Sequence, residues 1–160
     1  MAKARQPHYV IDTSSIIHWY VETYTPDIFP KLPERIDDLV GEGRLLSPEA
    51  VRGEIRPGDD LHKWAKQQTT LFVEEEEDVQ RRVARLMRLH HNSGKPQKGI
   101  TGADPFVISL AQSLGAHWVV VCNEHAGSAE NRKIPYVCKA ESVQCISFQE
   151  LMRMEGWQFR

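Results

Sequence analysis

The sequence predicts an α/β fold in which a central, mainly parallel sheet of about five strands lies between two layers of helices. Short apolar runs typical of buried strands alternate along the chain with stretches whose apolar residues recur at helical spacing. The clearest unit is a helix over residues 106–114, a stop at Gly115 and a buried strand over 118–122. The 160 residues, 41% of them hydrophobic, are enough to bury one core, so we expect a single domain over residues 1–160.

The first strand is expected at residues 9–11, where an apolar run ends abruptly at Asp12. The helix after this strand needs a cap, and Thr13, Ser14 or Ser15 can provide it. Asp12 is therefore expected just beyond the carboxyl end of this strand.

The rest of the chain continues the alternation of strands and helices. Ser47 is a predicted N-cap with Pro48 at the first helical position, and Ser147 begins a capping box with Glu150 before the last helix. Further strands are expected at 44–46, 71–73 and 143–146, and further helices at 36–40, 48–55, 61–65, 79–87 and 151–154. Non-helical segments are expected at 24–33, 92–102, 125–133 and 134–138, the last of them extended and apolar.

Composition narrows the classes of protein to consider. A formal net charge of -2 excludes a global basic field, so any contact with nucleic acid must rest on a local patch. The three cysteines form no CxxC pair and leave one over, which indicates a reducing cytosol rather than a disulfide framework. No apolar run approaches the roughly 20 residues of a membrane-spanning helix. We therefore expect a cytoplasmic protein with no membrane association.

Four carboxylates, Asp12, Glu54, Asp104 and Glu124, are expected at one edge of the sheet. In open parallel sheets, sites form beyond the carboxyl ends of strands and at helix N-termini. Two carboxylates about 4 Å apart repel by roughly 4 kcal/mol at an effective dielectric constant near 20. No lysine or arginine lies close enough in the sequence to be an obvious partner. Such hard oxygen ligands suit Mg²⁺ or Mn²⁺, which support hydrolysis of phosphodiester bonds.

Purely structural explanations remain open for two of these acids. Asp104 fits a capping box with Thr101, and it also fits an N-cap directly before Pro105. For Glu54 the structural alternative is an exposed helix glutamate. Glu49 opens the same predicted helix and competes with Glu54 for this position, but the favourable helix dipole of the first turn already explains Glu49.

The ordered acids and their neighbours resemble the motifs of the PIN-domain nucleases. The matching segments are Tyr-Val-Ile-Asp-Thr-Ser-Ser-Ile-Ile at 9–17, Glu54, Gly-Ala-Asp at 102–104 and Val-Val-Cys-Asn-Glu at 120–124. The resemblance extends from Tyr9 to about Leu151, and the segments 24–26, 29–30, 102–105 and 133–138 resemble a mostly uncharacterised prokaryotic branch. It implies a three-layer α/β/α fold and a metal-dependent ribonuclease, commonly the toxin of a toxin–antitoxin pair. RNA and a cognate antitoxin protein are the partners it implies, and a homodimer is a further candidate.

The resemblance also suggests roles for the acids. Asp12, Asp104 and either Glu54 or Glu124 would hold the metal ion, directly or through waters, and the remaining carboxylate would orient or deprotonate the attacking water. Ser14 is a candidate for a hydrogen bond to water or phosphate, although helix capping explains it equally well. Because water attacks rather than the 2′-hydroxyl, the products should carry 5′-phosphate ends.

Basic residues between 81 and 98 are candidates for contacts with substrate. Lys95 and Lys98 lie in the expected loop at 92–102 and could follow the RNA backbone. Arg81, Arg82, Arg85 and Arg88 could extend this track, but the acids in the first turn of the same helix favour a solvated surface. His90 and His91 are expected at the surface, at the end of this helix.

Two departures from the family pattern fall near the fourth acid. Many PIN domains have an aspartate after a Thr-x step, whereas this chain has Cys122-Asn123-Glu124. Asn123 or Ser128 is a candidate to replace a hydrogen bond that the missing hydroxyl would make, and both are candidates for contacts with substrate. The departures leave open a second interpretation, a catalytically inactive binding module with a PIN-like fold. A phosphatase with an aspartyl nucleophile is disfavoured, because Ser14 stands where Asp-x-Asp would need its second aspartate.

Overall fold

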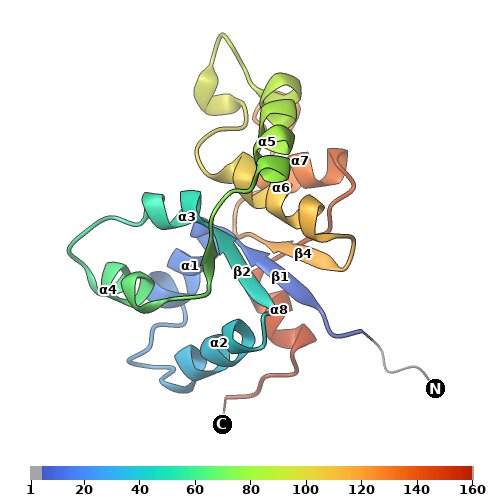
Figure 1. Cartoon of the computed structure of the whole chain (residues 1–160). Helices are drawn as coiled ribbons and strands as arrows, with labels where there is room; N and C mark the ends of the chain where they lie inside the picture. The colour runs from blue at the N-terminus through green and yellow to red at the C-terminus, as the bar shows by residue number, and fades with distance from the viewer. Residues whose placement is uncertain (1–4, 160) are drawn as a thin grey trace.

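Five parallel strands form the central sheet of the computed structural model, which describes residues 5–159 (Figure 1). The order of the strands across the sheet is β3-β2-β1-β4-β5. Their bounds are His8–Ile11 (β1), Leu45–Pro48 (β2), Phe72–Val73 (β3), Trp118–Val121 (β4) and Cys145–Ile146 (β5). The order reverses direction between β1 and β4, and crevices that bind ligands form beyond the carboxyl ends of strands at such a point.

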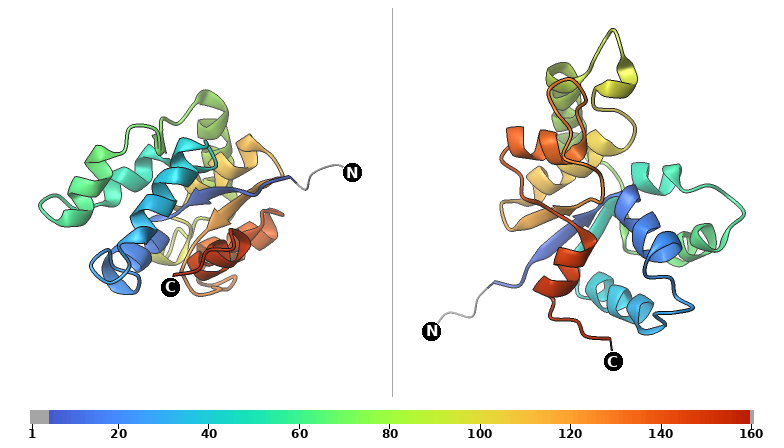
Figure 2. Two further views of the ribbon diagram at one scale, coloured as in Figure 1. Left: turned by 90° about the horizontal axis from the view of Figure 1, so that it is seen from below. Right: turned by 180° about the vertical axis from the view of Figure 1, so that it is seen from behind.

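Helices cover both faces of this sheet, as the sequence predicts. The α-helices are Thr13–Ile17 (α1), Lys31–Gly41 (α2), Glu49–Glu54 (α3), Asp60–Gln67 (α4), Glu77–His90 (α5), Asp104–Leu114 (α6), Ile134–Ala140 (α7) and Phe148–Met154 (α8). A π-helix, η1, spans His18–Glu22, and a 3₁₀ turn, η2, spans Pro96–Lys98. Helices α5, α6 and α7 lie together on one face, and α2 and α8 lie on the other (Figures 1 and 2). The result is the three-layer α/β/α arrangement.

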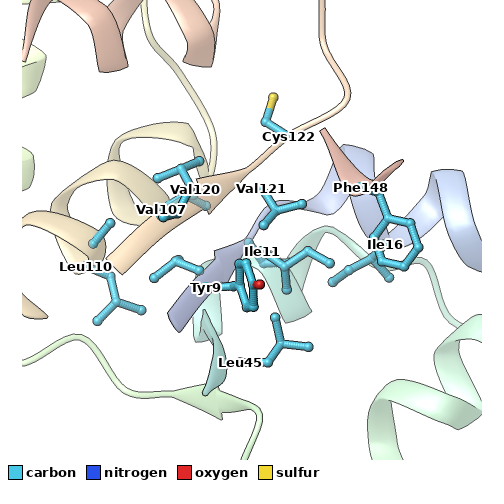
Figure 3. Packing of buried hydrophobic residues seen from close by; sticks show 14 of the residues in the cluster. Tyr9, Ile11, Ile16, Leu45, Val107, Leu110, Val120, Val121, Cys122 and Phe148 are labelled. Atoms are coloured by element: carbon cyan, nitrogen blue, oxygen red, sulfur yellow. The ribbon is translucent and has the colours of Figure 1, made fainter. Parts of the chain in front are cut away.

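Strand β4 and residues 9–11 of β1 are buried because both faces of the sheet are covered here. Tyr9 and Ile11 of β1 pair with Val119 and Val121 of β4, so these side chains point to the same face of the sheet. Val120 points to the opposite face. In Figure 3, Ile11 and Val121 lie near Phe148 of α8, and Val120 lies near Val107 of α6. Every residue of β4 is buried, which explains why its sequence shows no polar alternation.

The structure corrects the predicted cap of α1. Thr13, Ser14 and Ser15 all lie inside this helix, and the N-cap is Asp12, whose side chain accepts a hydrogen bond from the backbone N–H of Ser14 at 3.2 Å. Asp12 has the extended backbone that an N-cap needs, because it directly continues β1. The carboxylate at the end of the first strand is therefore also fixed by the helix that comes after it.

Ser47 and Pro48 belong to strand β2, so the prediction that they open a helix is wrong. The Ser47 side chain is fully buried and its hydroxyl donates to the carbonyl of Ile11 at 2.8 Å, which ties β2 to β1. Pro48 is the N-cap residue of α3. Helix α2 also begins earlier than expected, at Lys31, because Pro33 lies in the first turn, where a missing N–H breaks no intrahelical bond.

Residues 134–138 are helical, which overturns the extended segment expected there. Ile134, Val137 and Cys138 of α7 are buried at the spacing of one helix face, and Pro135 occupies the first turn, where it is tolerated. Four apolar residues and a proline do not by themselves distinguish the two conformations. Ser147 is confirmed as the N-cap of α8, since its side chain accepts a hydrogen bond from the N–H of Glu150 at 3.2 Å. The Glu150 carboxylate accepts from the Ser147 hydroxyl at 3.4 Å, rather than from the backbone N–H that a capping box would use.

Across residues 5–159 the structure contains no helix that is both long enough and apolar enough to cross a membrane.

Candidate metal centre

Three of the four predicted acids meet beyond the carboxyl ends of β1 and β4. One side-chain oxygen each from Asp12, Asp104 and Glu124 lies within 4.8 Å of the other two. Asp12 comes directly after β1, Asp104 is the first residue of α6, and Glu124 lies three residues beyond β4. We call these three residues the acidic cluster. Asp12 and Glu124 are 112 residues apart in the sequence, and the parallel pairing of β1 with β4 brings them together.

Asp12 is the most enclosed member of the cluster, with only 2% of its surface exposed. Its backbone N–H donates to the carbonyl of Val121 at 2.9 Å, which extends the pairing of β1 with β4. Its Oδ2 accepts from the hydroxyl of Ser14 at 2.8 Å, and the same hydroxyl accepts from the N–H of Asn123 at 3.0 Å. Ser14 thus lies at the site, where it orients the Asp12 carboxylate and links the segments just beyond the two strands.

Asp104 does not cap α6, so both capping interpretations of this residue are wrong. The N-cap residue is Ala103, which has helical backbone angles and makes no side-chain capping bond. Instead, Oε1 of Glu54 accepts the backbone N–H of Ala103 at 2.7 Å, so an acid from α3 provides the cap. This leaves the Asp104 carboxylate available to the acidic cluster.

Glu54 adjoins the cluster without belonging to the three-oxygen group. Its side chain reaches over Gly102, whose φ of +60° favours glycine, and a Cβ at that position would lie 3.2 Å from Oε1 of Glu54. The charge of Glu54 acts on Asp104 and contributes to raising its pKa. Glu54 is therefore close to the cluster, and one of its oxygens is held by the start of α6.

Glu124 is held by the start of another helix. Its Oε2 accepts the backbone N–H of Ile134, the first residue of α7, at 3.2 Å. The backbone N–H of Glu124 in turn lies 3.4 Å from the sulfur of Cys122, which accepts it. The sulfur of Cys122 therefore anchors the chain next to Glu124.

The electrostatics of the cluster favour a bound cation. Burial, followed by the charges of Asp12, Glu124 and Glu54, raises the pKa of Asp104 from 3.8 to about 8. Burial also raises the pKa of Asp12 to about 6, although the hydrogen bond from Ser14 opposes this shift. At 4.8 Å, two ionised carboxylates repel by about 3 kcal/mol at an effective dielectric constant near 20.

No salt bridge within residues 5–159 involves any of these four acids. A divalent cation would remove the repulsion, and an all-carboxylate set of ligands fits hard ions that prefer oxygen. The acidic cluster can therefore hold a divalent metal ion.

Asn123 and Ser128, which are predicted to contact substrate, make hydrogen bonds within the protein. The side-chain oxygen of Asn123 accepts from the hydroxyl of Ser15 at 2.5 Å and from the backbone N–H of Phe148 at 3.1 Å, which joins α1 to the start of α8. The Ser128 hydroxyl accepts from the N–H of Asn131 at 3.2 Å within a surface turn. Both side chains thus stabilise the framework around the site.

The predicted basic track divides into exposed and paired residues. Lys95 and Lys98 are exposed, and they line a surface pocket together with Ala129 and Glu130 of the loop after β4. By contrast, Arg81, Arg82 and Arg85 of α5 each pair with a carboxylate, at distances of 2.7 to 2.9 Å. Arg81 and Arg82 pair with acids in the first turn of α5, as expected of a solvated helix surface, whereas Arg85 pairs with Glu141 at the end of α7.

His90 is buried, contrary to the expectation of a surface histidine. Its Nε2 lies 2.9 Å from Glu141, and its Nδ1 lies 2.8 Å from the guanidinium of Arg132. Since arginine can only donate, Nδ1 accepts and Nε2 carries the proton that is donated to Glu141. Through this contact α5 holds the loop that leads into α7.

One basic residue, Lys133, lies near the acidic cluster although no sequence pattern predicts it there. Lys133 is the N-cap residue of α7, and its positive charge opposes the rise in the pKa of Asp104. It lies 29 residues after Asp104 and nine after Glu124, so no local spacing signals its proximity. The Pro135 two positions later, as a helix-start signal, is the one indication that the chain turns back here.

Comparison with known proteins assigns the chain to a family defined by sequence. The family model described as a domain of unknown function, DUF4411, matches residues 9–159. No curated protein gives a significant match. The matched region begins in β1 and includes all three residues of the acidic cluster, together with Glu54. The chain therefore belongs to the DUF4411 family.

Proposed function

We propose that this protein is a metal-dependent endoribonuclease that hydrolyses RNA phosphodiester bonds. The proposal is carried by the acidic cluster, in which oxygens of Asp12, Asp104 and Glu124 converge within 4.8 Å. Clustering these carboxylates disfavours the metal-free folded state, so their convergence is explained by an ion that the fold is built to bind. The resemblance to PIN-domain nucleases supports RNA as the substrate.

Each acid has a distinct part in the proposed reaction. Asp12, Asp104 and Glu124 would hold Mg²⁺ or Mn²⁺, with Ser14 orienting Asp12 and the N–H of Ile134 orienting Glu124. When bound, such an ion stabilises negative charge on the phosphate and makes water more acidic. Glu54 is exposed and holds Ala103 through Oε1. In this proposal its Oε2 would accept a proton from the attacking water.

Attack by water defines the products of this reaction. The water oxygen bonds to phosphorus, the bond from phosphorus to the 3′ oxygen breaks, and that oxygen leaves with a proton. The fragments should carry 5′-phosphate and 3′-hydroxyl ends. A 2′,3′-cyclic phosphate would require the 2′-hydroxyl as nucleophile and would contradict this assignment.

The test is cleavage of a mixed RNA pool by the purified protein, with Mg²⁺, with Mn²⁺ and with a chelator. The Asp104→Asn variant removes one cluster carboxylate at nearly constant volume, and Asp27→Asn makes the same change at an exposed loop position. We expect cleavage that requires both the metal and Asp104 and that Asp27→Asn leaves unchanged. Cleavage that survives Asp104→Asn would reject the assigned site. Metal binding without any cleavage would favour a binding module that has lost turnover.

We further propose that the protein acts as the toxin of a toxin–antitoxin pair. This role rests on the family resemblance alone. A neighbouring gene for a small regulatory protein that binds this chain and suppresses its cleavage of RNA would support the role. A chain encoded and acting alone would argue against it.

A further inference from the structure

A nuclease site built from four carboxylates has an electrostatic difficulty with its own substrate. When all are ionised, Asp12, Glu54, Asp104 and Glu124 carry four negative charges, and one divalent ion leaves a net charge of two negatives. The scissile phosphodiester adds another negative charge, and each unit pair at about 5 Å repels by roughly 3 kcal/mol at an effective dielectric constant near 20. A positive side chain beside the cluster would offset this repulsion.

Lys133 is placed to provide that charge. The next residue, Ile134, donates its backbone N–H to Oε2 of Glu124 at 3.2 Å, so the Lys133 backbone adjoins the acidic cluster. The side chain is partly buried, and its charge acts directly on Asp104. Nevertheless its ammonium group forms no salt bridge and no hydrogen bond with any group in the described part of the chain. A partly buried cation without a fixed partner beside an anion-processing site is available to a ligand.

Several contacts hold the loop at 127–132 in place, and they fix the backbone position from which the Lys133 side chain extends. Gly127 has a φ of +75°, and a Cβ there would lie 2.9 Å from the backbone nitrogen and 3.0 Å from the Cβ of Lys133. The guanidinium of Arg132 donates to the carbonyls of Leu89 at 2.9 Å and Ala129 at 3.1 Å. The backbone N–H of Arg132 also donates to the carbonyl of Lys98. These contacts join the loop to α5 and to the segment containing η2.

We infer that the Lys133 ammonium contacts a non-bridging oxygen of the scissile phosphate and stabilises the charge that develops there. This inference rests on the proposed nuclease function, which it deepens by adding a substrate contact. The opposite possibility is that Lys133 merely neutralises the carboxylates. The two roles differ in their effect on RNA. In both, removing the positive charge leaves metal affinity equal or higher, but only the removal of a substrate contact weakens RNA binding and lowers cleavage.

The experiment compares Lys133→Met and Lys133→Arg with Lys139→Met. Lys139 is an exposed residue of the same helix, so its substitution makes the same change in charge away from the cluster. Mn²⁺ affinity is measured by titration calorimetry, and cleavage of the mixed RNA pool is measured with saturating Mn²⁺. RNA affinity is measured separately on a labelled single-stranded RNA, with the Lys133→Met and Lys139→Met changes each placed in the Asp104→Asn background.

We expect Lys133→Met to lower kcat/KM on the order of 100-fold, as removal of a charge-stabilising donor does elsewhere, with Mn²⁺ affinity equal or higher. Lys133→Arg should retain most of the activity, and Lys139→Met all of it. In the Asp104→Asn background, Lys133→Met should weaken RNA binding and reduce the dependence of log K on log salt by about 0.7, the value for one phosphate contact in a single strand.

Three other outcomes are informative. Unchanged cleavage and unchanged RNA affinity in Lys133→Met would overturn the inference, and so would a parallel loss of Mn²⁺ binding, which indicates a structural role. If the wild-type protein cleaves nothing but Lys133→Met still weakens RNA binding, the nuclease proposal fails while Lys133 remains a phosphate contact.

Discussion

Replacing Asp104 by asparagine removes the ionisable group whose pKa is displaced furthest in the acidic cluster. Its pKa is about 8 in the folded protein and 3.8 in the reference state. Between pH 4 and pH 8 the unfolded chain therefore loses a proton that the folded protein retains, so the stability of the metal-free protein falls as pH rises through this window and levels off above it. At about 1.4 kcal/mol per pKa unit, the loss at pH 7 is roughly 4 kcal/mol.

Asparagine has nearly the same shape but no proton to lose, so Asp104→Asn should stabilise the metal-free protein. We expect a gain of about 2–4 kcal/mol at pH 7, below the full loss because the amide must still be partly buried. For a chain of this size the gain corresponds to a rise in Tm of roughly 5–15 °C. Near pH 4 the two proteins should be equally stable, because Asp104 is then largely protonated in the folded state and still about half protonated in the unfolded chain.

The assay is thermal unfolding in a chelator at pH 4 and pH 7, with the same measurement then repeated at pH 7 with Mn²⁺. With Mn²⁺ at 100 times its Kd, a binding-competent protein gains about 2.7 kcal/mol, so the wild type should recover stability and the variant should not. The Asp27→Asn variant should behave as the wild type throughout. A variant less stable than the wild type at pH 7 in chelator would refute the reasoning, since Asp104 would then make a favourable contact that outweighs its repulsions.

Three further measurements test other parts of the site. At pH 7 the binding of Mn²⁺ should release about one proton, most of it from Asp104, and at pH 5 it should release about two, because Asp12, with a pKa of about 6, is then also protonated. Calorimetry in buffers of different ionisation enthalpy measures the number of protons released. A number that does not change with pH would contradict the assignment. Asn123→Ala should destabilise the protein by roughly 1–3 kcal/mol in denaturant unfolding, because it leaves the N–H of Phe148 unpaired. Its Mn²⁺ affinity should stay the same. A selective loss of RNA binding would instead support the predicted contact of Asn123 with substrate. Gly127→Ala should destabilise the folded protein by about 1–3 kcal/mol, because residue 127 has a positive φ. The same change should also lower the rate of RNA cleavage, because it displaces the Lys133 backbone. Gly41→Ala, at a position with open space around it, should leave the rate of cleavage unchanged.

The architecture of this protein is determined by local patterns in its sequence. The apolar run of β4 and the helical spacing of α6 each identify one element, because burial on one or both faces imposes a periodicity that can be read directly. The order of these elements predicts parallel strands, and parallel strands place the residues just beyond their carboxyl ends at one edge of the sheet. For this reason Asp12 and Glu124 could be expected to meet although 112 residues separate them.

The roles of side chains that depend on contacts between distant residues are determined only by the tertiary structure. Asp104 has the sequence context of a helix cap, but Glu54, 50 residues away, takes the backbone N–H of Ala103 and leaves Asp104 to the cluster. Residues 134–138 form a helix because burial of one face against the sheet selects that conformation over an extended one. The same fold turns the chain back so that Lys133 and the N–H of Ile134 reach the acids. Local sequence encodes periodicity and turn chemistry, whereas hydrogen-bond partners and shared electric fields depend on distances that exist only once the sheet and its helices have packed.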